Sequence, residues 1–214
     1  MLTVACVWVN GHLPYKVEYV ERLHAMARRW ISRPLTFVCL TDQPHLVPAG
    51  VTAIEIPNPN PLKGWWSKVE LFRAGRFTGR VLYLDLDSLI VDPLDAVIDY
   101  PAAFALAPHA GTFNGKGGLH VVKAFNSSVM VWDAGTQDYL YTDWTPAVAA
   151  MLWGDQDWIG TMAHTAKAMP ARWFPRMSEL DGREPSSDAK VVLVKKPKNE
   201  EAAKQFAWFR EAWA

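Results

Sequence analysis

The chain has 214 residues, enough for one large domain that buries roughly 70% of its unfolded surface. Lys plus Arg and Asp plus Glu number 22 each, so no overall positive field would draw the protein onto nucleic acid or an anionic membrane. No apolar run approaches the roughly 20 residues that a membrane span needs. Residues 1–7 lack a signal-peptide pattern, which predicts a cytoplasmic location for a soluble, globular protein.

The first part of the chain alternates strand-like and helix-like patterns. The predicted elements are strands at 3–9, 35–40 and 51–56 and a helix at 20–31. Prolines in 57–61 exclude a central strand there. Cys6 and Cys39 lie within the predicted strands, where a small buried thiol is expected rather than a disulfide or a metal ligand.

Ser67 and Glu70 have the spacing of a capping box. They predict a helix of about ten residues that begins at Ser67. Lys68 then lies in the first turn, where its positive charge opposes the helix dipole. This conflict favours a functional lysine, with a solvated helix residue as the plain alternative.

Four apolar residues at 81–84 lead into Asp85-Leu86-Asp87, a pattern typical of a strand buried on both faces. Strand periodicity places Asp85 and Asp87 on the same side. Two like charges about 4 Å apart repel by roughly 4 kcal/mol at an effective dielectric of about 20, so a cation or a shared proton is expected between them. Open α/β sheets bind ligands at the carboxyl ends of their strands. The pair therefore predicts a divalent metal at a ligand site.

The rest of the chain continues the alternation. Asp92-Pro93 predicts an N-cap followed by proline at the first helical position. The other predictions are a mobile loop at 110–119, strands at 125–132 and 191–194, a helix from near Trp158, an exposed loop at 181–188 and a helix at 200–213. The pattern predicts an α/β fold with a doubly wound sheet, and no repeat or linker divides the single domain 1–214.

Five blocks stand in a characteristic order. They are Val9-Asn10 with Tyr15, Trp66-Ser67-Lys68, Asp85-Leu86-Asp87, Phe125-Asn126-Ser127-Ser128-Val129-Met130 and Asp155-Gln156-Asp157-Trp158. This order resembles the nucleotide-sugar glycosyltransferases of the GT-A fold. The resemblance runs from the first strand to about residue 198 and is nearest to the retaining glycosyltransferase family 8, which includes glycogenin and bacterial galactosyltransferases. In that family the third block is the DxD motif.

The resemblance implies a GT-A, Rossmann-like fold, with helices on both faces of a mostly parallel sheet, and a retaining transferase that uses a nucleotide diphosphate sugar, with UDP-sugar expected. Asp85 and Asp87 would hold Mn²⁺ or Mg²⁺, and Asp155 and Gln156 would be the catalytic residues beside the anomeric carbon. The implied donor-binding residues are Val9, Asn10, Tyr15, Asp42, Lys68, Leu86, Asn126, Ser127, Lys195, Lys196 and Lys198. The acceptor stays open among glycan, protein, small molecule and modified nucleobase.

The C-terminal segment departs from the family pattern. Family members carry a third metal-ligating histidine in an HxGxxKPW-like segment, whereas residues 191–198 read VVLVKKPK. A lysine of this segment can neutralise a diphosphate directly as a point charge. His120 and His164 are candidate replacements for the missing ligand, although each also fits an ordinary structural histidine.

Two other interpretations remain. The run VLYLDLDSLIV also resembles the nucleophile motif of haloacid-dehalogenase-like phosphatases, but that motif normally lies on the first strand of its domain, and three strand-like segments precede it here. The missing histidine also fits a catalytically silent nucleotide-sugar-binding protein. Individually, Asn126 fits a strand-edge cap and Asp155 fits a helix N-cap.

Overall fold

A computed structural model describes residues 1–9, 15–57, 62, 64–109, 112–114, 120–122, 125–195 and 197–213. The strands are β1 Leu2–Trp8, β2 Leu35–Thr41, β3 Thr52–Glu55, β4 Arg80–Leu84, β5 Ser88–Ile90, β6 Phe104–Pro108, β7 Thr112–Asn114, β8 His120–Val122, β9 Phe125–Asp133, β10 Lys167–Ala168 and β11 Val191–Leu193. The α-helices are α1 Val17–Trp30, α2 Asp95–Ile98, α3 Tyr139–Thr142, α4 Pro146–Met151, α5 Asp155–Met162, α6 Met177–Leu180, α7 Pro197–Ala203 and α8 Ala207–Trp213. The 3₁₀ helices are η1 Pro44–Leu46, η2 Gly64–Phe72 and η4 Ala171–Trp173.

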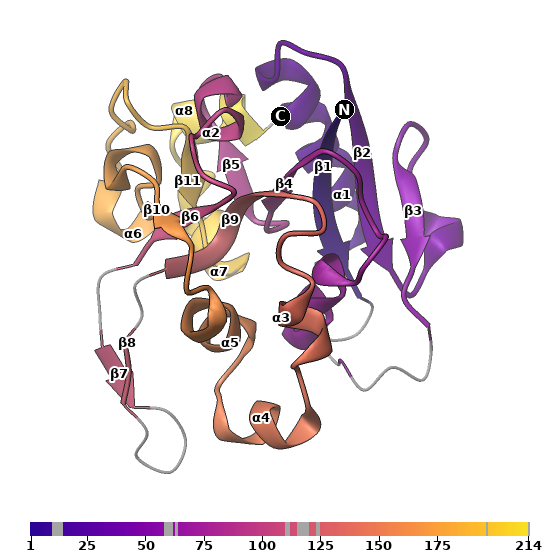
Figure 1. Ribbon diagram of the computed structural model, residues 1–214. Helices are drawn as coiled ribbons and strands as arrows, with labels where there is room; N and C mark the ends of the chain where they lie inside the picture. The colour runs from indigo at the N-terminus through magenta and orange to yellow at the C-terminus, as the bar shows by residue number, and fades with distance from the viewer. Residues whose placement is uncertain are drawn as a thin grey trace.

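The centre of the molecule is a seven-stranded sheet in the order β10-β6-β9-β4-β1-β2-β3 (Figure 1). The neighbours β4, β1, β2 and β3 are parallel, and β10 is parallel to β6. Only β9 runs against its neighbours β4 and β6 within this sheet. The predicted α/β class with a mostly parallel sheet is confirmed, as is the presence of three strands before the acidic motif.

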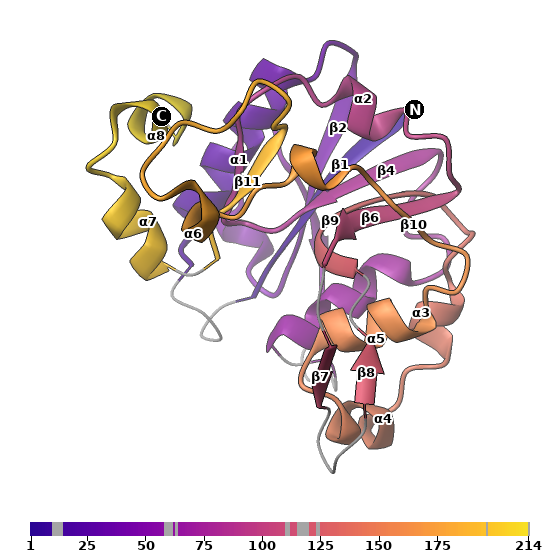
Figure 2. The ribbon, with the colours of Figure 1, turned by 90° about the vertical axis from the view of Figure 1, so that its left-hand side faces the viewer.

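Side chains of β4 alternate between two hydrophobic cores, one on each face of the sheet. Leu82 and Leu84 pack in the core that includes the buried face of α1 and α8. Val81 and Tyr83 pack in the core that includes η2, α3 and α5. Figure 2 shows α7 and α8 on the α1 side and α3 and α5 in the other layer. Strand periodicity therefore directs Asp85, which follows Tyr83 by two residues, toward η2 and α5.

A second, two-stranded sheet joins β11 to β5 in antiparallel register. Leu193 pairs with Ser88, the residue directly after Asp87. The chain that continues from β11 to Lys195 therefore leaves this small sheet at the end where the acidic motif enters it. β7 and β8 pair with each other in a separate hairpin.

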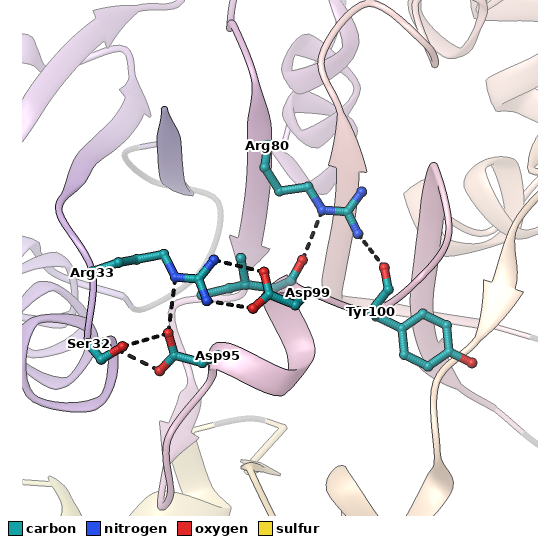
Figure 3. A network of polar contacts seen from close by, with 7 residues as sticks. Ser32, Arg33, Arg80, Asp95, Asp99 and Tyr100 are labelled. Carbon is teal, nitrogen blue, oxygen red and sulfur yellow. Dashed lines mark hydrogen bonds and ion pairs between the residues drawn. The ribbon is translucent and has the colours of Figure 1, made fainter.

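An arginine network lies at the opposite end of β4 (Figure 3). Arg33 donates through Nε to Asp95 at 3.1 Å and through both terminal nitrogens to Asp99 at 2.7 and 2.5 Å. Arg80, the first residue of β4, donates to the carbonyl oxygens of Ile98, Tyr100 and Ala102. The network joins α2 to the start of β4 and to the segment before β2. It therefore supports the scaffold at the end of β4 that lies away from the acidic motif.

The predicted helix at Ser67 is wrong in its start and its type. The segment is the 3₁₀ helix η2, which begins at Gly64, and Ser67 is buried inside it. Because Ser67 is the fourth residue of η2, it cannot be the N-cap of that element, and its hydroxyl donates to the carbonyl oxygen of Leu62 at 3.0 Å. Lys68 consequently lies in the middle of the element and not in its first turn.

Two other predicted helices have different bounds. The Asp92 side chain pairs with Lys190, and α2 begins only at Asp95, so Asp92-Pro93 is not its start. The predicted helix at 200–213 is two helices, α7 and α8. The break lets Phe209 and Trp213 stack at 5.4 Å between ring centroids and bury themselves in the α1 core.

Other predictions agree with the structure. The strands at 125–132 and 191–194 are present as β9 and β11, and 181–188 is largely exposed. Cys6 and Cys39 are buried free thiols. Within the predicted loop 110–119, residues 112–114 instead form β7, and the remainder lies outside the described residues. Among the described helices, none is long and apolar enough to span a membrane.

Candidate functional site

A cavity of about 220 Å³ opens where β1 and β4 end. Its walls come from segments far apart in the chain: the end of β1, η2, the acidic motif, the start of β9 and the start of α5. The sequence-predicted residues that line it are Val9, Tyr15, Lys68, Asp85, Leu86, Asp87, Ser127, Asp155 and Gln156. This is the carboxyl end of the parallel strands, where α/β sheets bind their ligands.

Lys68 is the centre of the cavity's polar network. Its Nζ lies 2.9 Å from Asp85 Oδ1 and 2.8 Å from Asp155 Oδ2. It also donates to the Ser127 hydroxyl at 3.2 Å. Lys68 is only 8% exposed. Its single buried ammonium is shared by carboxylates from two different elements.

The charges in this network stabilise one another. Burial by itself lowers the pKa of Lys68, but Asp155 and Asp85 together raise it above its ordinary value. Burial raises the pKa of Asp85, but the Lys68 ammonium and the Tyr83 hydroxyl outweigh it and lower that pKa. The Tyr83 hydroxyl donates to Asp85 Oδ1 at 2.7 Å. Lys68 and Asp85 are therefore both charged at neutral pH.

Asp87 has a different partner, Tyr15. The Tyr15 hydroxyl donates to Asp87 Oδ2 at 2.6 Å. Burial and the charge of Asp87 raise the pKa of Tyr15, so its hydroxyl stays protonated as a donor. Asp85 and Asp87 share one cavity as predicted, but β4 ends at Leu84, so a turn closed by the Ser88 N–H to Asp85 carbonyl bond of 3.0 Å brings them together and not strand periodicity. Tyr15, implied as a donor-binding residue by the resemblance, contacts the acidic motif in this structure.

A bulge in β9 exposes Ser127 to the cavity. The register with β6 shifts between Leu106, which pairs with Met130, and Ala107, which pairs with Asn126. Such bulges re-aim side chains. Here the Ser127 hydroxyl donates to Asp155 Oδ2 at 2.8 Å.

Asn126 is fully buried and is not part of the cavity lining. Its Oδ1 accepts a hydrogen bond from the backbone N–H of Ser128 at 2.8 Å, which is the strand-edge role. Its Nδ2 has no partner among the residues that the structure describes. A contact of Asn126 with the sugar stays a prediction.

Asp155 is the first residue of α5, whereas Gly154 is the N-cap. The interpretation of Asp155 as an N-cap is therefore wrong, and the expected helix start near Trp158 moves to Asp155. At the helix N-terminus the dipole favours its negative charge. Its side chain is 9% exposed and is directed to Lys68 and Ser127. Gln156 follows it into the cavity lining.

The C-terminal lysines are only partly described. Lys195 has a left-handed backbone with φ of 51°. Asn199 Nδ2 holds this turn by donating to the carbonyl oxygens of Val194 at 2.8 Å and Lys195 at 2.5 Å. Lys195 does not line the cavity. Lys196 and the side chain of Lys198 lie outside the described part of the chain.

The remaining predicted residues are placed as follows. Asp42 follows β2, is half-buried and does not line the cavity. His164 is exposed just beyond α5 and is also absent from the lining, so the structure does not support it as a metal ligand. Asn10 and the side chain of His120 lie outside the described residues.

The acidic motif offers carboxylate oxygens, which suit Mg²⁺ and Mn²⁺. Asp85 is engaged through Oδ1 and Asp87 through Oδ2, and both side chains line the cavity. Within the described residues, no three His, Cys, Asp or Glu side chains are placed so that they could hold a metal ion together. The two acids fit a metal that completes its coordination shell with ligand oxygens and water.

Sequence analysis missed two residues of the site. Tyr83 bonds to Asp85, and its position two residues earlier on the same strand face was an available signal. Trp65 lines the cavity and is 46% exposed. It lies directly before the Trp66-Ser67-Lys68 block, and nothing local distinguished its exposed indole from a core tryptophan.

No family model matches this chain, and no curated protein matches it by sequence. Solved structures do. The galactosyltransferase LgtC in complex with donor and acceptor sugar analogues aligns with a TM-score of 0.65 and 11% identity, over 99% of this chain and 95% of that chain. An active-site mutant of LgtC aligns with a TM-score of 0.66 and 11% identity, over 98% and 95%. The protein therefore has the GT-A fold that was expected from the sequence.

Proposed function

We propose that this protein is a glycosyltransferase that moves a sugar from a nucleotide diphosphate sugar, with a UDP-sugar as the expected donor, to an acceptor hydroxyl. The observation that carries the proposal is the Lys68 network, which joins Asp85 at the end of β4 to Asp155 at the start of α5. It lies in a cavity at the ligand-binding edge of a GT-A sheet.

Breaking the bond between sugar and phosphate leaves a negatively charged diphosphate, so the site must supply positive charge on that side. Lys68 is such a charge, held in place before the donor arrives. Lys195, on the turn after β11, is the second candidate source, together with Lys196 and Lys198 expected from the sequence. Mn²⁺ or Mg²⁺ held by Asp85 and Asp87 would add Lewis-acid stabilisation of the leaving group.

Polar groups next to Lys68 suit a sugar. Ser127, Asp155 and Gln156 offer a hydroxyl, a carboxylate and an amide to sugar hydroxyls. One of the similar solved structures is an active-site mutant in which glutamine is replaced by glutamate, and we assign Gln156 a comparable place beside the anomeric carbon. We propose retention of the anomeric configuration and assign no nucleophile.

The phosphatase alternative is less well supported. Its motif normally begins a domain, whereas β4 is the fourth strand in the chain and lies between β1 and β9. It also gives the Asn126 and Asp155 blocks no natural place. A nucleotide-sugar-binding protein without activity would keep the same cavity, so activity measurements must separate it from an enzyme.

The decisive experiment incubates the purified chain with a panel of nucleotide sugars, with and without Mn²⁺, and follows donor hydrolysis and sugar transfer. Asp87→Asn should abolish both while leaving the fold intact, because it removes one metal-holding charge. Asp188→Asn, which changes an exposed carboxylate far along the chain, is the matched control. If Asp87→Asn turns over as fast as the wild-type protein, the metal site is contradicted. If the wild-type protein releases phosphate from 4-nitrophenyl phosphate, it is a phosphatase. If it binds nucleotide sugars without turnover, it is a silent protein.

A further inference from the structure

Two exposed tryptophans lie on segments that also carry cavity-lining residues. Trp65 on η2 is 46% exposed, and Trp153, just before α5, is 55% exposed. Met151, at the end of α4, is 48% exposed. Among the described residues, only Met1 and Leu46 are other large hydrophobic side chains with such exposure. Because Trp65 also lines the cavity, this surface is continuous with the proposed reaction site.

Gly154 links the two tryptophan-bearing segments. A Cβ at this position would lie 3.2 Å from Trp65 Nε1 and 3.3 Å from Trp65 Cδ1, which is tighter than ordinary contact. The backbone itself does not require glycine, because its φ of −178° is extended and open to any residue. Gly154 therefore leaves space for the Trp65 indole against the start of α5.

This glycine has a cost for the helix. Gly154 is the N-cap of α5, a position where Ser, Thr, Asp or Asn would satisfy a free backbone N–H, and α5 has no side-chain cap. Glycine at this position thus leaves space for the Trp65 indole but supplies no side-chain hydrogen bond to the start of α5. The protected contact holds an exposed indole next to Asp155 and Gln156.

We propose that Trp65 and Trp153 form a tryptophan platform that binds the sugar ring of a neutral glycoside acceptor. The inference rests on the proposed function, because it assigns the acceptor side of the same cavity. One face of a hexopyranose ring is lined by C–H groups, which pack on an indole, while its hydroxyl groups reach polar partners. Gln156, two residues after Gly154, offers such a partner.

The charge of the cavity favours a neutral acceptor over a polyanion. Its described charged side chains are the three carboxylates Asp85, Asp87 and Asp155 and one ammonium, Lys68, which pairs with Asp85 and Asp155. A divalent cation on Asp85 and Asp87 would only balance this negative charge, and the donor diphosphate would add negative charge again. Phosphate-rich acceptors such as DNA or RNA are bound through basic side chains that release counterions. A glycoside hydroxyl meets no such repulsion here.

The first test measures transfer to a panel of methyl glucosides, galactosides, mannosides and N-acetylglucosaminides, with donor hydrolysis measured in parallel. In Trp65→Ala the acceptor KM should rise about tenfold more than the donor KM, because the lost contact serves the acceptor. Trp153→Ala should act in the same direction, and Trp65→Phe should recover part of the loss. Leu46→Ala, an equally exposed hydrophobic residue outside the cavity lining, is the control.

Gly154→Ser separates a binding role from a structural one. The new hydroxyl can cap α5, so the melting temperature should stay level or rise. The added side chain displaces the Trp65 indole, so the acceptor KM should still rise severalfold relative to the donor KM. If Gly154→Ser and Trp65→Ala both leave the acceptor KM unchanged, the platform is overturned.

The indole N–H resonances of the protein report binding directly. Methyl glycosides should shift the resonances of Trp65 and Trp153 and leave that of buried Trp132 in place. Shifts with a nucleoside or an aromatic peptide only, or with none of these probes, overturn the glycoside assignment. Glycoside binding at the platform without any donor binding or hydrolysis would instead refute the proposed function and leave the platform standing.

Discussion

Lys68 makes the charged residues of the site depend on one another. Removing charges from water is costly, and the cost is offset here by close ion pairs and by added hydrogen bonds from Ser127 and Tyr83. The carboxylates of Asp85 and Asp155 share this one buried ammonium. Loss of Lys68 would therefore leave two carboxylates in a poorly solvated place.

Lys68→Met should lower the free energy of unfolding by about 3 kcal/mol at pH 7, because breaking a buried pair leaves uncompensated charge. Denaturant unfolding measures this effect. Steady-state kinetics should also show a higher donor KM and a lower turnover. Lys167→Met, which removes an exposed lysine of β10, should change neither quantity.

The same variant should respond to pH in a defined direction. The folded-state pKa of Asp85 is lowered, so its stabilisation is present above the unfolded value of about 3.9 and is lost as pH falls through the folded value. The folded-state pKa of Lys68 is raised, so its stabilisation is present below about 10.4 and is lost as pH rises through the folded value. The difference between wild type and Lys68→Met should thus be largest between about pH 5 and 10 and shrink toward acid. A difference that is the same at pH 3 and pH 7 would contradict a role for charge.

At the scale of elements, the short sheet β5–β11 and helix α7 set the position of Lys195. β11 places the following turn beside the acidic motif, and Asn199 fixes the left-handed backbone of Lys195. A non-glycine residue with positive φ stores strain that its surroundings must hold. Glu200, buried with 6% of its side chain exposed, anchors α7 to α1 through the Tyr19 hydroxyl.

Asn199→Ala should release this turn. We expect a severalfold rise in the donor KM and a small fall in melting temperature, because two hydrogen bonds to carbonyl oxygens are lost while every lysine is kept. Gln205→Ala is the matched control, because it removes one exposed hydrogen bond from a side-chain amide to the carbonyl oxygen of Ala202. A donor KM equal to that of the control would mean that the turn does not bind the donor.

At the scale of the whole molecule, the cavity exists only where distant segments meet. Lys68 comes from η2 on one face of the sheet, Asp85 from the end of β4, Ser127 from the bulged start of β9 and Asp155 from α5. Because each wall is a separate element, donor, metal and acceptor groups can be coupled through one small space.

Metal and nucleotide should therefore bind cooperatively. With Asp85 and Asp87 as the proposed protein ligands, Mn²⁺ must complete its shell with diphosphate oxygens and water. Calorimetry should show weak Mn²⁺ binding to the protein alone and clearly tighter binding with UDP present, and UDP must gain by the same factor. If Mn²⁺ binds tightly without UDP, a third protein ligand such as His120 is required. If the affinity for UDP is the same with and without Mn²⁺, the C-terminal lysines and not the metal bind the diphosphate.

The sequence by itself determined the features that depend on neighbours along the chain. Buried apolar runs identified β1, β2 and β4, and the expectation that Asp85 and Asp87 share one site is met, although a turn after β4 and not the strand itself brings them together. The order of the blocks was sufficient to expect a GT-A fold, which the solved structures confirm at 11% identity. These inferences hold because periodicity and the order of elements are local or topological properties.

Only the tertiary structure decided which side chains meet. The pairing of Lys68 with Asp155, the Tyr15 bond to Asp87 and the contact of Trp65 with Gly154 all join residues from different elements. The helix start at Ser67 was wrong because the element already begins at Gly64, and the start at Asp92 was wrong because its carboxylate pairs with Lys190, 98 residues away along the chain. Such choices are made by packing across the fold, where burial and long-range hydrogen bonds outweigh local propensity.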